Sequence, residues 1–338
     1  MPIAHWFFSP VCALLLAPLL LGLINRTKAV VAGRRGQPLL QPYWDVAKCL
    51  RRGAVYGEVT SWLFRLGPVV NLATLMTGLL ILPFGGVGAV VSFPGDLIVL
   101  AGLFALGRFV TVLAALDTGS SFEGMGASRE VHFAALAEPA LLIGLATLVR
   151  VTGAFSLTPI YGAITVGIWA QALPTLALVA MTLLVLELVE NTRVPVDDPT
   201  THLELTMIHE VMVLDHSGPD LAYIQYAAAL KLWILGALFV GLVVPIRSGS
   251  LWLVGGAALL AMAGLAVVIG MVESAMAPPW STGQIDPKQK FDLTSPGART
   301  RRSPRASLDH LVPAPVAVAA RWGRALRAEH EPAPRLSA

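Results

Sequence analysis

Seven long apolar runs limit what this chain can fold into. They lie at about residues 6–25, 67–83, 96–116, 133–150, 168–189, 221–245 and 251–272. About 20 apolar residues in a helix cross the hydrocarbon core of a bilayer, and only helices and closed barrels satisfy every backbone polar group in lipid. The pattern predicts an all-α, polytopic integral membrane protein of seven spans. An eighth span is expected only if the run 160–189 is broken at Pro174, where a kink is the commoner outcome.

The composition agrees with a membrane protein. Of the 338 residues, 55% are hydrophobic and 13% are charged, whereas soluble domains carry about 25% charged residues. The two cysteines, Cys12 and Cys49, form no CxxC pair. We therefore expect no disulfide, iron–sulfur cluster or thiolate metal site in this chain.

Basic residues are concentrated in two parts of the chain. Eight of the 24 Lys and Arg lie between Arg26 and Arg65, and ten lie after residue 280. Because cytoplasmic loops carry the excess of Lys and Arg, we expect loop 25–66 and the C-terminus in the cytoplasm and the N-terminus outside. Counting spans then places segments 117–132 and 190–220 on the cytoplasmic side as well. Such clustering is better evidence for membrane orientation than for nucleic-acid binding. We therefore predict no nucleic-acid partner.

The last 62 residues differ from the rest of the chain. Residues 277–338 are rich in Pro and Arg and contain no run long enough to span a bilayer. This composition is typical of a disordered segment. We therefore divide the chain into a transmembrane domain, 1–276, and a basic cytoplasmic tail, 277–338.

Segment 34–48 has the pattern of a helix in the membrane interface. Its apolar residues share one broad face, with Asp45 and Lys48 opposite. Tyr43 and Trp44 are side chains that favour the headgroup level. An ordinary juxtamembrane anchor would show the same pattern, so the residues by themselves do not indicate a ligand.

The stretch from Glu187 to Asp220 is the most unusual part of the chain. It holds eight of the 21 carboxylates, three histidines and a single basic residue, Arg193. Apolar runs flank it on both sides, and acidic residues beside membrane spans are costly unless protons, water or a partner use them. A function that moves or binds charge is therefore expected here.

Ionisable residues within or next to spans are candidates for a proton path. Glu138 lies inside the fourth run, where a carboxylate must face protein or water; a helix-packing hydrogen bond is the alternative. Glu187 and Glu190 are three residues apart on one helical face, so their titrations should be coupled; alternatively they are headgroup-level acids, one of them paired with Arg193. Lys231 should have a carboxylate partner, and we expect Glu138 or Glu187.

Metal and phosphate sites are poorly supported. His202, His209 and His216 are seven residues apart, which is too far for one ion to be bound from one helix, and His209-Glu210 lacks the second histidine of HExxH. We predict no metal site, and expect these histidines to line a water-filled cavity. The glycines of segment 117–132 do not form a phosphate-loop motif, so we expect a flexible re-entrant loop there.

Two loop segments resemble a known family. The run Glu190-Asn-Thr-Arg193-Val-Pro195-Val-Asp197, followed by Pro199, Glu204-Leu205 and Asp215-His-Ser217-Gly218, resembles the cytoplasmic loop of the quinone-site membrane subunit of respiratory complex I. It is more similar to the homologous subunit of group 4 [NiFe]-hydrogenases and formate hydrogenlyases. The run LDTGSSFEGMGASRE, ending at Glu130, resembles the hydrogenase-type members. As the alternative to a flexible loop, this resemblance implies that the segment packs beside the later acidic one.

The resemblance implies a non-catalytic subunit of an oxidoreductase complex in a bacterial or archaeal inner membrane. Its partners would be peripheral redox subunits that carry Fe–S clusters and Ni–Fe, together with antiporter-like membrane subunits; quinone is a further candidate ligand. The implied proton path comprises Glu138, Glu187, Glu190, Asp197, Glu204, Glu210 and Lys231. The implied interface with the redox arm or quinone side comprises Arg34, Arg35, Gln41, Asp45, Arg129, Glu130, Arg193 and Asp215.

Two rival functions remain open at this point. A quinone-reducing complex I subunit should carry fewer histidines in the acidic loop, so His202 and His216 argue against it. An independent cation or proton transporter should show inverted repeats, and the chain has no self-similar halves.

Overall fold

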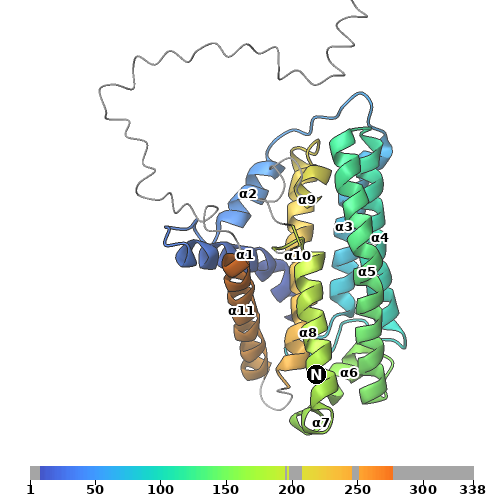
Figure 1. Ribbon diagram of the computed structural model, residues 1–338, viewed down its shortest axis with the longest axis vertical. Coiled ribbons are helices and arrows are strands. Elements are labelled where there is room, and N and C mark those ends of the chain that lie inside the picture. Colours follow the sequence, from blue (N-terminus) through green and yellow to red (C-terminus); the bar gives the residue numbers. More distant parts are fainter. Residues whose placement is uncertain (1–7, 195, 198–207, 246–250, 277–338) are drawn as a thin grey trace, which may run out of the picture. The chain divides into compact units, whose positions relative to one another are not determined.

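The computed structural model describes residues 8–194, 196–197, 208–245 and 251–276 (Figure 1). These residues form eleven helices and, outside them, one isolated β-bridge between Phe84 and Val87. The helices are α1 (Phe8–Val31), α2 (Gln41–Leu50), α3 (Trp62–Ile81), α4 (Asp96–Asp117), α5 (Ser121–Thr152), α6 (Leu157–Ala163), α7 (Val166–Gln171), α8 (Leu173–Glu190), α9 (Ile208–Met212), α10 (Pro219–Val243) and α11 (Leu251–Met276).

Seven of these helices are long and apolar enough to cross a membrane, namely α1, α3, α4, α5, α8, α10 and α11. The prediction of an all-α membrane protein with seven spans is confirmed. The run 160–189 is broken, but near Ala172, and the pieces α6 and α7 are too short to span. Pro174 lies in the first turn of α8, where its missing N–H has no intrahelical partner to lose. It therefore begins the helix and does not kink it.

The prediction of a flexible re-entrant loop at 117–132 is wrong. Helix α5 begins at Ser121 and continues for 32 residues, so only a short connection separates it from α4. A side chain on Gly126 would lie 2.9 Å from Met212 and 3.0 Å from the Ile208 carbonyl of α9. The glycine therefore permits close helix packing and does not indicate flexibility.

The predicted short helix is confirmed as α2, which begins at Gln41, so residues 34–40 precede it. Pro42 lies in its first turn, and none of its residues is fully buried. Trp44 is 61% exposed, as expected of a side chain at the headgroup level. The position of α2 in the membrane interface stays a prediction.

Helix α10 is the centre of the bundle. Its most apolar window is 67% buried, against 28–44% for the other six span-length helices. It packs against α1, α2, α3, α8 and α11, and Trp233 is its largest fully buried side chain. A helix that is apolar on all sides suits this central position.

The packing of α10 on α1 depends on a proline. Pro18 lies inside α1, and because it has no N–H, the carbonyl of Leu14 loses its intrahelical donor. The hydroxyl of Tyr226 in α10 donates to that carbonyl at 2.7 Å. The hydroxyl of Tyr43 in α2 donates to the next carbonyl, that of Leu15. In lipid, neighbouring helices commonly supply the groups that a proline leaves unpaired.

We expect Tyr226→Phe to lower the free energy of unfolding by about 1 kcal/mol, the usual size of such a bond between membrane helices. The measurement is thermal unfolding of the detergent-purified protein. In a Pro18→Ala background the restored N–H should satisfy Leu14, and the effect of Tyr226→Phe should fall towards zero. Equal losses in both backgrounds would contradict this account.

Candidate functional site

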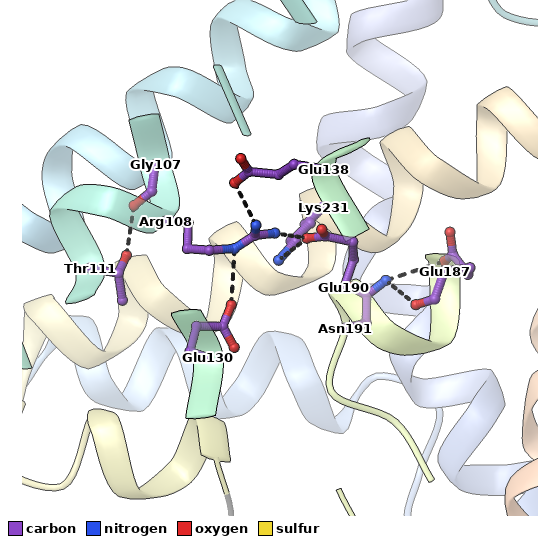
Figure 2. A network of polar contacts seen from close by, with 9 residues as sticks. All are labelled: Gly107, Arg108, Thr111, Glu130, Glu138, Glu187, Glu190, Asn191 and Lys231. Carbon is purple, nitrogen blue, oxygen red and sulfur yellow. Dashed lines mark hydrogen bonds and ion pairs between the residues drawn. The ribbon is translucent and has the colours of Figure 1, made fainter. Parts of the chain in front are cut away.

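Arg108 is the centre of a buried cluster of charges (Figure 2). Its side chain is 8% exposed and reaches from α4 to α5 and α8. The guanidinium binds Glu130 at 3.1 Å and Glu138 at 2.7 Å, both on α5. It also binds Glu190, the last residue of α8. One arginine thus ties three carboxylates from two helices to a third helix.

Lys231 completes this cluster, which we call the Arg108 cluster (Arg108, Glu130, Glu138, Glu190 and Lys231). The Lys231 ammonium on α10 lies 2.9 Å from Glu190 Oε2. The prediction that it pairs with Glu138 or Glu187 is wrong. Glu138 is already bound by Arg108, and it is Glu190 that faces α10. With all five groups ionised, three carboxylates face two cations, so the cluster carries one excess negative charge.

Glu187 lies one turn before Glu190 but in different surroundings (Figure 2). It is 1% exposed, and its Oε2 has no hydrogen-bond partner among the residues that the structure describes. Asn191 Nδ2 donates to its backbone carbonyl at 2.8 Å and approaches Oε1 at 3.5 Å. The two glutamates are close in sequence, but only Glu190 is ion-paired.

A second buried ion pair ties α11 to the bundle. Glu273 is 1% exposed and lies 2.6 Å from Lys28 of α1 and 3.3 Å from Arg193, which follows α8. The alternative in which Arg193 pairs with Glu187 or Glu190 is therefore not what the structure shows. Arg193 binds Glu273 and lines the same small cavity as members of the Arg108 cluster.

Two cavities adjoin at Arg193. The smaller, of about 80 Å³, is lined by Arg108, Glu130, Glu190 and Lys231. The larger, of about 550 Å³, lies among α1, α2, α9 and α10. Residues shared by the two linings are Leu21, Arg193, His209, Ile224 and Ala228. Two of these five residues, Arg193 and His209, are polar, and each lines both cavities.

His209 is the histidine that lines both cavities. Burial lowers the pKa of its imidazole below the usual value, with Lys231 and Arg193 acting in the same direction and Glu130 opposing them. The ring is therefore neutral near pH 7. A neutral imidazole has one donor and one acceptor nitrogen, so it can pass a proton between groups on its two sides.

The remaining residues of the predicted proton path are dispersed. Asp197 is buried, and its Oδ2 accepts a hydrogen bond of 2.9 Å from the backbone N–H of Ile208 at the start of α9. Glu210 is exposed and lines the larger cavity. Glu204 lies outside the described residues. The structure thus brings Glu138, Glu190 and Lys231 together, and leaves Asp197 in a capping position.

The predicted interface residues separate into three groups. Gln41, Asp45 and Arg193 line the larger cavity, and Gln41 donates to Asp45 at 2.8 Å. Glu130 belongs to the Arg108 cluster and is not at a surface. Residues Arg34, Arg35 and Asp215 are exposed, and Arg129 is partly buried.

Several functional residues were not selected from the sequence. Arg108 could have been selected most easily, because an isolated arginine inside an apolar run costs free energy unless other charged groups bind it. Glu273, in the last span, could have been selected for the same reason. Glu123 is fully buried and accepts a hydrogen bond of 3.2 Å from the backbone N–H of Asp215. No three His, Cys, Asp or Glu side chains among the described residues are grouped as metal ligands.

His216 is buried against an aromatic ring. It stacks on Phe64 of α3, with centroids 3.9 Å apart and an interplanar angle of 8°. Its Nδ1 has no partner among the described residues. Burial lowers the pKa of this imidazole to about 4. The ring is therefore held neutral where the acidic stretch meets α3.

The chain is similar to membrane subunits of respiratory complexes. The NADH dehydrogenase family model matches residues 5–277. Formate hydrogenlyase subunit 4 of Escherichia coli (strain K12) is 33% identical over 262 residues, which are 77% of this chain and 84% of that protein. Hydrogenase-4 component C of the same organism is 34% identical over 236 residues, or 70% and 73%.

More distant similarities extend the comparison. An NADH-quinone oxidoreductase subunit of Koribacter versatilis (strain Ellin345) is 29% identical over 179 residues, 50% of this chain and 42% of that protein. A chain of the membrane-bound sulfane sulfur reductase, an archaeal respiratory membrane complex, has a TM-score of 0.67. That match covers 83% of this chain and 93% of the other at 15% identity, so it shows a shared fold.

We expect Arg108→Gln to destabilise the protein by about 3–5 kcal/mol, because three carboxylates then share only Lys231. A lowered melting temperature in detergent is the measurement. Lys48→Gln is the control, since the exposed Lys48–Asp45 pair should contribute less than about 1 kcal/mol. Adding Glu138→Gln to Arg108→Gln should restore part of the loss. A melting temperature unchanged in Arg108→Gln would refute a structural role for the cluster.

Acid should weaken the packing of His216. The pKa of about 4 in the folded protein lies below the ordinary histidine value of 6.5, so stability is lost as the pH falls from about 6.5 to about 4. Between pH 7 and pH 5 the loss attributable to this residue should be about 2 kcal/mol. The melting temperature of His216→Phe should therefore fall less than that of wild type over this range. His132→Gln, at an exposed position, should behave like wild type; a His216→Phe variant as pH-sensitive as wild type would contradict the assignment.

Proposed function

The chain belongs to the NADH dehydrogenase family, and from this premise we propose that it is the membrane-anchoring and proton-coupling subunit of a complex I-like hydrogenase or formate hydrogenlyase. The observation that carries the proposal is the Arg108 cluster: ion-paired carboxylates and cations on four helices, all but Glu138 mostly shielded from solvent, next to a cavity that residues 190–193 help to line. Two relatives at 33% and 34% identity, which are hydrogenase-type proteins by name, support the choice of complex.

The redox chemistry in this proposal belongs to partner subunits. Fe–S clusters and Ni–Fe would be held by peripheral subunits, since the two cysteines of this chain lie apart, in α1 and α2. The chain would dock those subunits on its cytoplasmic side, with Arg34 and Arg35 exposed beside α2 and Asp215 exposed after α9. The excess of Lys and Arg in loop 25–66 supports a cytoplasmic position for that loop, which would place the N-terminus outside the inner membrane.

The Arg108 cluster would convert a redox step into charge movement. A change of charge in the larger cavity is transmitted through His209 and Arg193, which also line the smaller cavity. The cluster has one more carboxylate than cations, so the uptake of one proton makes it neutral. Glu187, buried beside it and without an ion pair in the part of the chain that the structure describes, would hold a proton in turn.

Glu138 would be the point where charge leaves this chain. Its side chain is 38% exposed although it binds Arg108. A carboxylate on the outside of a spanning helix is expensive in contact with lipid. A neighbouring membrane subunit of the antiporter type would cover it and receive the charge.

The second candidate is a complex I subunit that binds quinone. The larger cavity favours it, because about 550 Å³ lies within the range of small-molecule sites. Apolar residues such as Leu214 and Leu221 would contact a ring and tail, and Gln41 would offer a hydrogen bond. The lower identity and coverage of the Koribacter versatilis relative place this candidate second.

A mild-detergent pull-down of the chain from its native membrane, with metal and flavin analysis, tests the proposal. Nickel and iron in the eluate are expected. Iron and flavin without nickel would favour the complex I candidate. A chain that elutes alone and without metal would contradict the proposal and indicate either an independent transporter or a subunit that no longer assembles.

In the membrane-embedded complex, Lys231→Met and Glu190→Gln should each reduce proton translocation per electron pair at least tenfold. They remove charges from the cluster but leave the peripheral redox centres in place. The measurement is dye quenching in inverted vesicles, beside the redox rate with an artificial electron partner. Glu58→Gln, in an exposed loop, should change neither value. Full translocation in both cluster variants would rule out the coupling role.

A further inference from the structure

The chain reverses its direction at the end of α1. Gly33 has a φ of 67°, in the left-handed region that favours glycine. Its N–H donates to the Val30 carbonyl at 3.0 Å, and the N–H of Arg34 donates to the Ala29 carbonyl at 2.8 Å. These two bonds form a Schellman motif, which ends a helix and turns the chain. The turn places Arg34 and Arg35 directly after the last carbonyls of α1.

The segment after this turn packs back against α1. A Cβ on Gly36 would lie 2.6 Å from the Cβ of Ala29, so only glycine fits at this position. Arg26 Nη1 donates to the Gly36 carbonyl at 3.3 Å. Arg26, in the last two turns of α1, is thereby brought next to the backbone that carries Arg34 and Arg35.

Three arginines at this turn lack a carboxylate partner in the part of the chain that the structure describes. Arg26, Arg34 and Arg35 are exposed, and no ion pair among the described residues neutralises their charges. Lys28, by contrast, binds Glu273 at 2.6 Å. We call Arg26, Arg34 and Arg35 the α1-end arginines.

Exposed apolar side chains lie at the same end of α1. Val30 and Val31, its last two residues, are 64% and 57% exposed. They end the candidate span Phe8–Val31, and the end of a span lies near the lipid headgroups. The α1-end arginines are all within five residues of Val31 in the sequence, so their long side chains reach the same level.

An anionic phospholipid matches both parts of this surface. A guanidinium binds a phosphate group through two parallel hydrogen bonds, and acyl chains would contact the two valines. Residues 25–44 contain no Asp or Glu. A headgroup with a net negative charge should therefore bind more strongly than a zwitterionic one, because the cation of a zwitterionic headgroup is repelled.

Two other occupants fit less well. Residues 277–338 carry ten Lys and Arg after residue 280 and five Asp and Glu, so charge repulsion disfavours the chain's own tail. A water-soluble acidic protein would pair with the arginines. It would not cover Val30 and Val31, however, because both lie within a candidate span.

We propose that the α1-end arginines, together with Val30 and Val31, bind the headgroup and the first acyl carbons of an anionic phospholipid. The phosphate would lie between Arg26 and the pair Arg34 and Arg35. Under the proposed function Arg34 and Arg35 also face peripheral subunits, and the lipid would then lie on the membrane side of that interface. The lipid site requires no partner subunit, so it stands or fails independently of the proposed function.

The test is photo-crosslinking of the full chain in phosphatidylcholine nanodiscs that contain a photoactivatable phosphatidylglycerol. In wild type, crosslinks should map to residues 25–44. Arg34→Gln, Arg35→Gln should reduce their yield at least about tenfold, because two charges near the headgroup are lost. The control is Arg51→Gln, Arg52→Gln, which removes the same charge from exposed arginines after α2 and should lower the yield less than about twofold. Equal losses in the two double variants, or no loss in the first, would overturn the proposal.

Thermal unfolding checks that the variant is folded. In phosphatidylcholine alone, Arg34→Gln, Arg35→Gln should melt at the wild-type temperature, because both side chains are exposed. Adding phosphatidylglycerol should raise the melting temperature of wild type, since a ligand that binds the folded state stabilises it. The same addition should leave the melting temperature of the variant unchanged. An equal rise in both proteins would contradict the site.

Two further outcomes distinguish the lipid from other ligands. Inorganic phosphate, at constant ionic strength, should not reduce the crosslinking yield, because it offers no acyl chain to the valines. Complete loss of the crosslinks would identify a site for free phosphate instead. Crosslinks confined to residues 277–338 would show that the basic tail attracts the lipid. Either result would overturn the proposal.

Discussion

The guanidinium of Arg108 and the three carboxylates around it form the interaction on which the site depends. Charges in a low-dielectric interior are tolerated only when they are paired and hydrogen-bonded. Glu130, Glu138 and Glu190 come from α5 and α8, and Lys231 adds α10. The position of these helices and the ionisation of these side chains are therefore mutually dependent. Such a cluster can couple charge to helix position, because a change of charge on one side chain changes how strongly the ion pairs hold the other helices.

A second constraint is the central position of α10. It packs against α1, α2, α3, α8 and α11. The hydroxyl of its Tyr226 donates to the carbonyl of Leu14 in α1, which Pro18 leaves without a donor. Lys231 is carried on the same helix. The core that gives the bundle its stability and the cation that neutralises Glu190 are thus parts of one element. This arrangement fixes the charge cluster on a rigid scaffold, while the larger cavity opens towards the loops.

The two ends of the bundle are built differently. At the end that carries the basic loop 25–66, Ser61 binds Asp117 at the end of α4, and Ser217 binds the backbone of Val55. At the other end, Asp96 is fully buried and accepts hydrogen bonds from Ser156 at 2.6 Å and from the N–H of Leu157 at 2.8 Å. The first end thus carries the larger cavity, of about 550 Å³, whereas at the second end hydrogen bonds hold a buried carboxylate in place.

The sequence by itself determined the membrane class, the seven spans, the helix of residues 41–50 and the concentration of acid after α8, because these depend on composition and local periodicity. It failed at segment 117–132, where glycines that serve close packing on α9 resembled a flexible loop. Only the tertiary structure decided which charges meet. Arg108 is 30 residues from Glu138 and 82 from Glu190, and Glu187 and Glu190, one turn apart, have different partners. Periodicity fixes the face of one helix, but the partner on another helix is set by packing between helices, which no local pattern encodes.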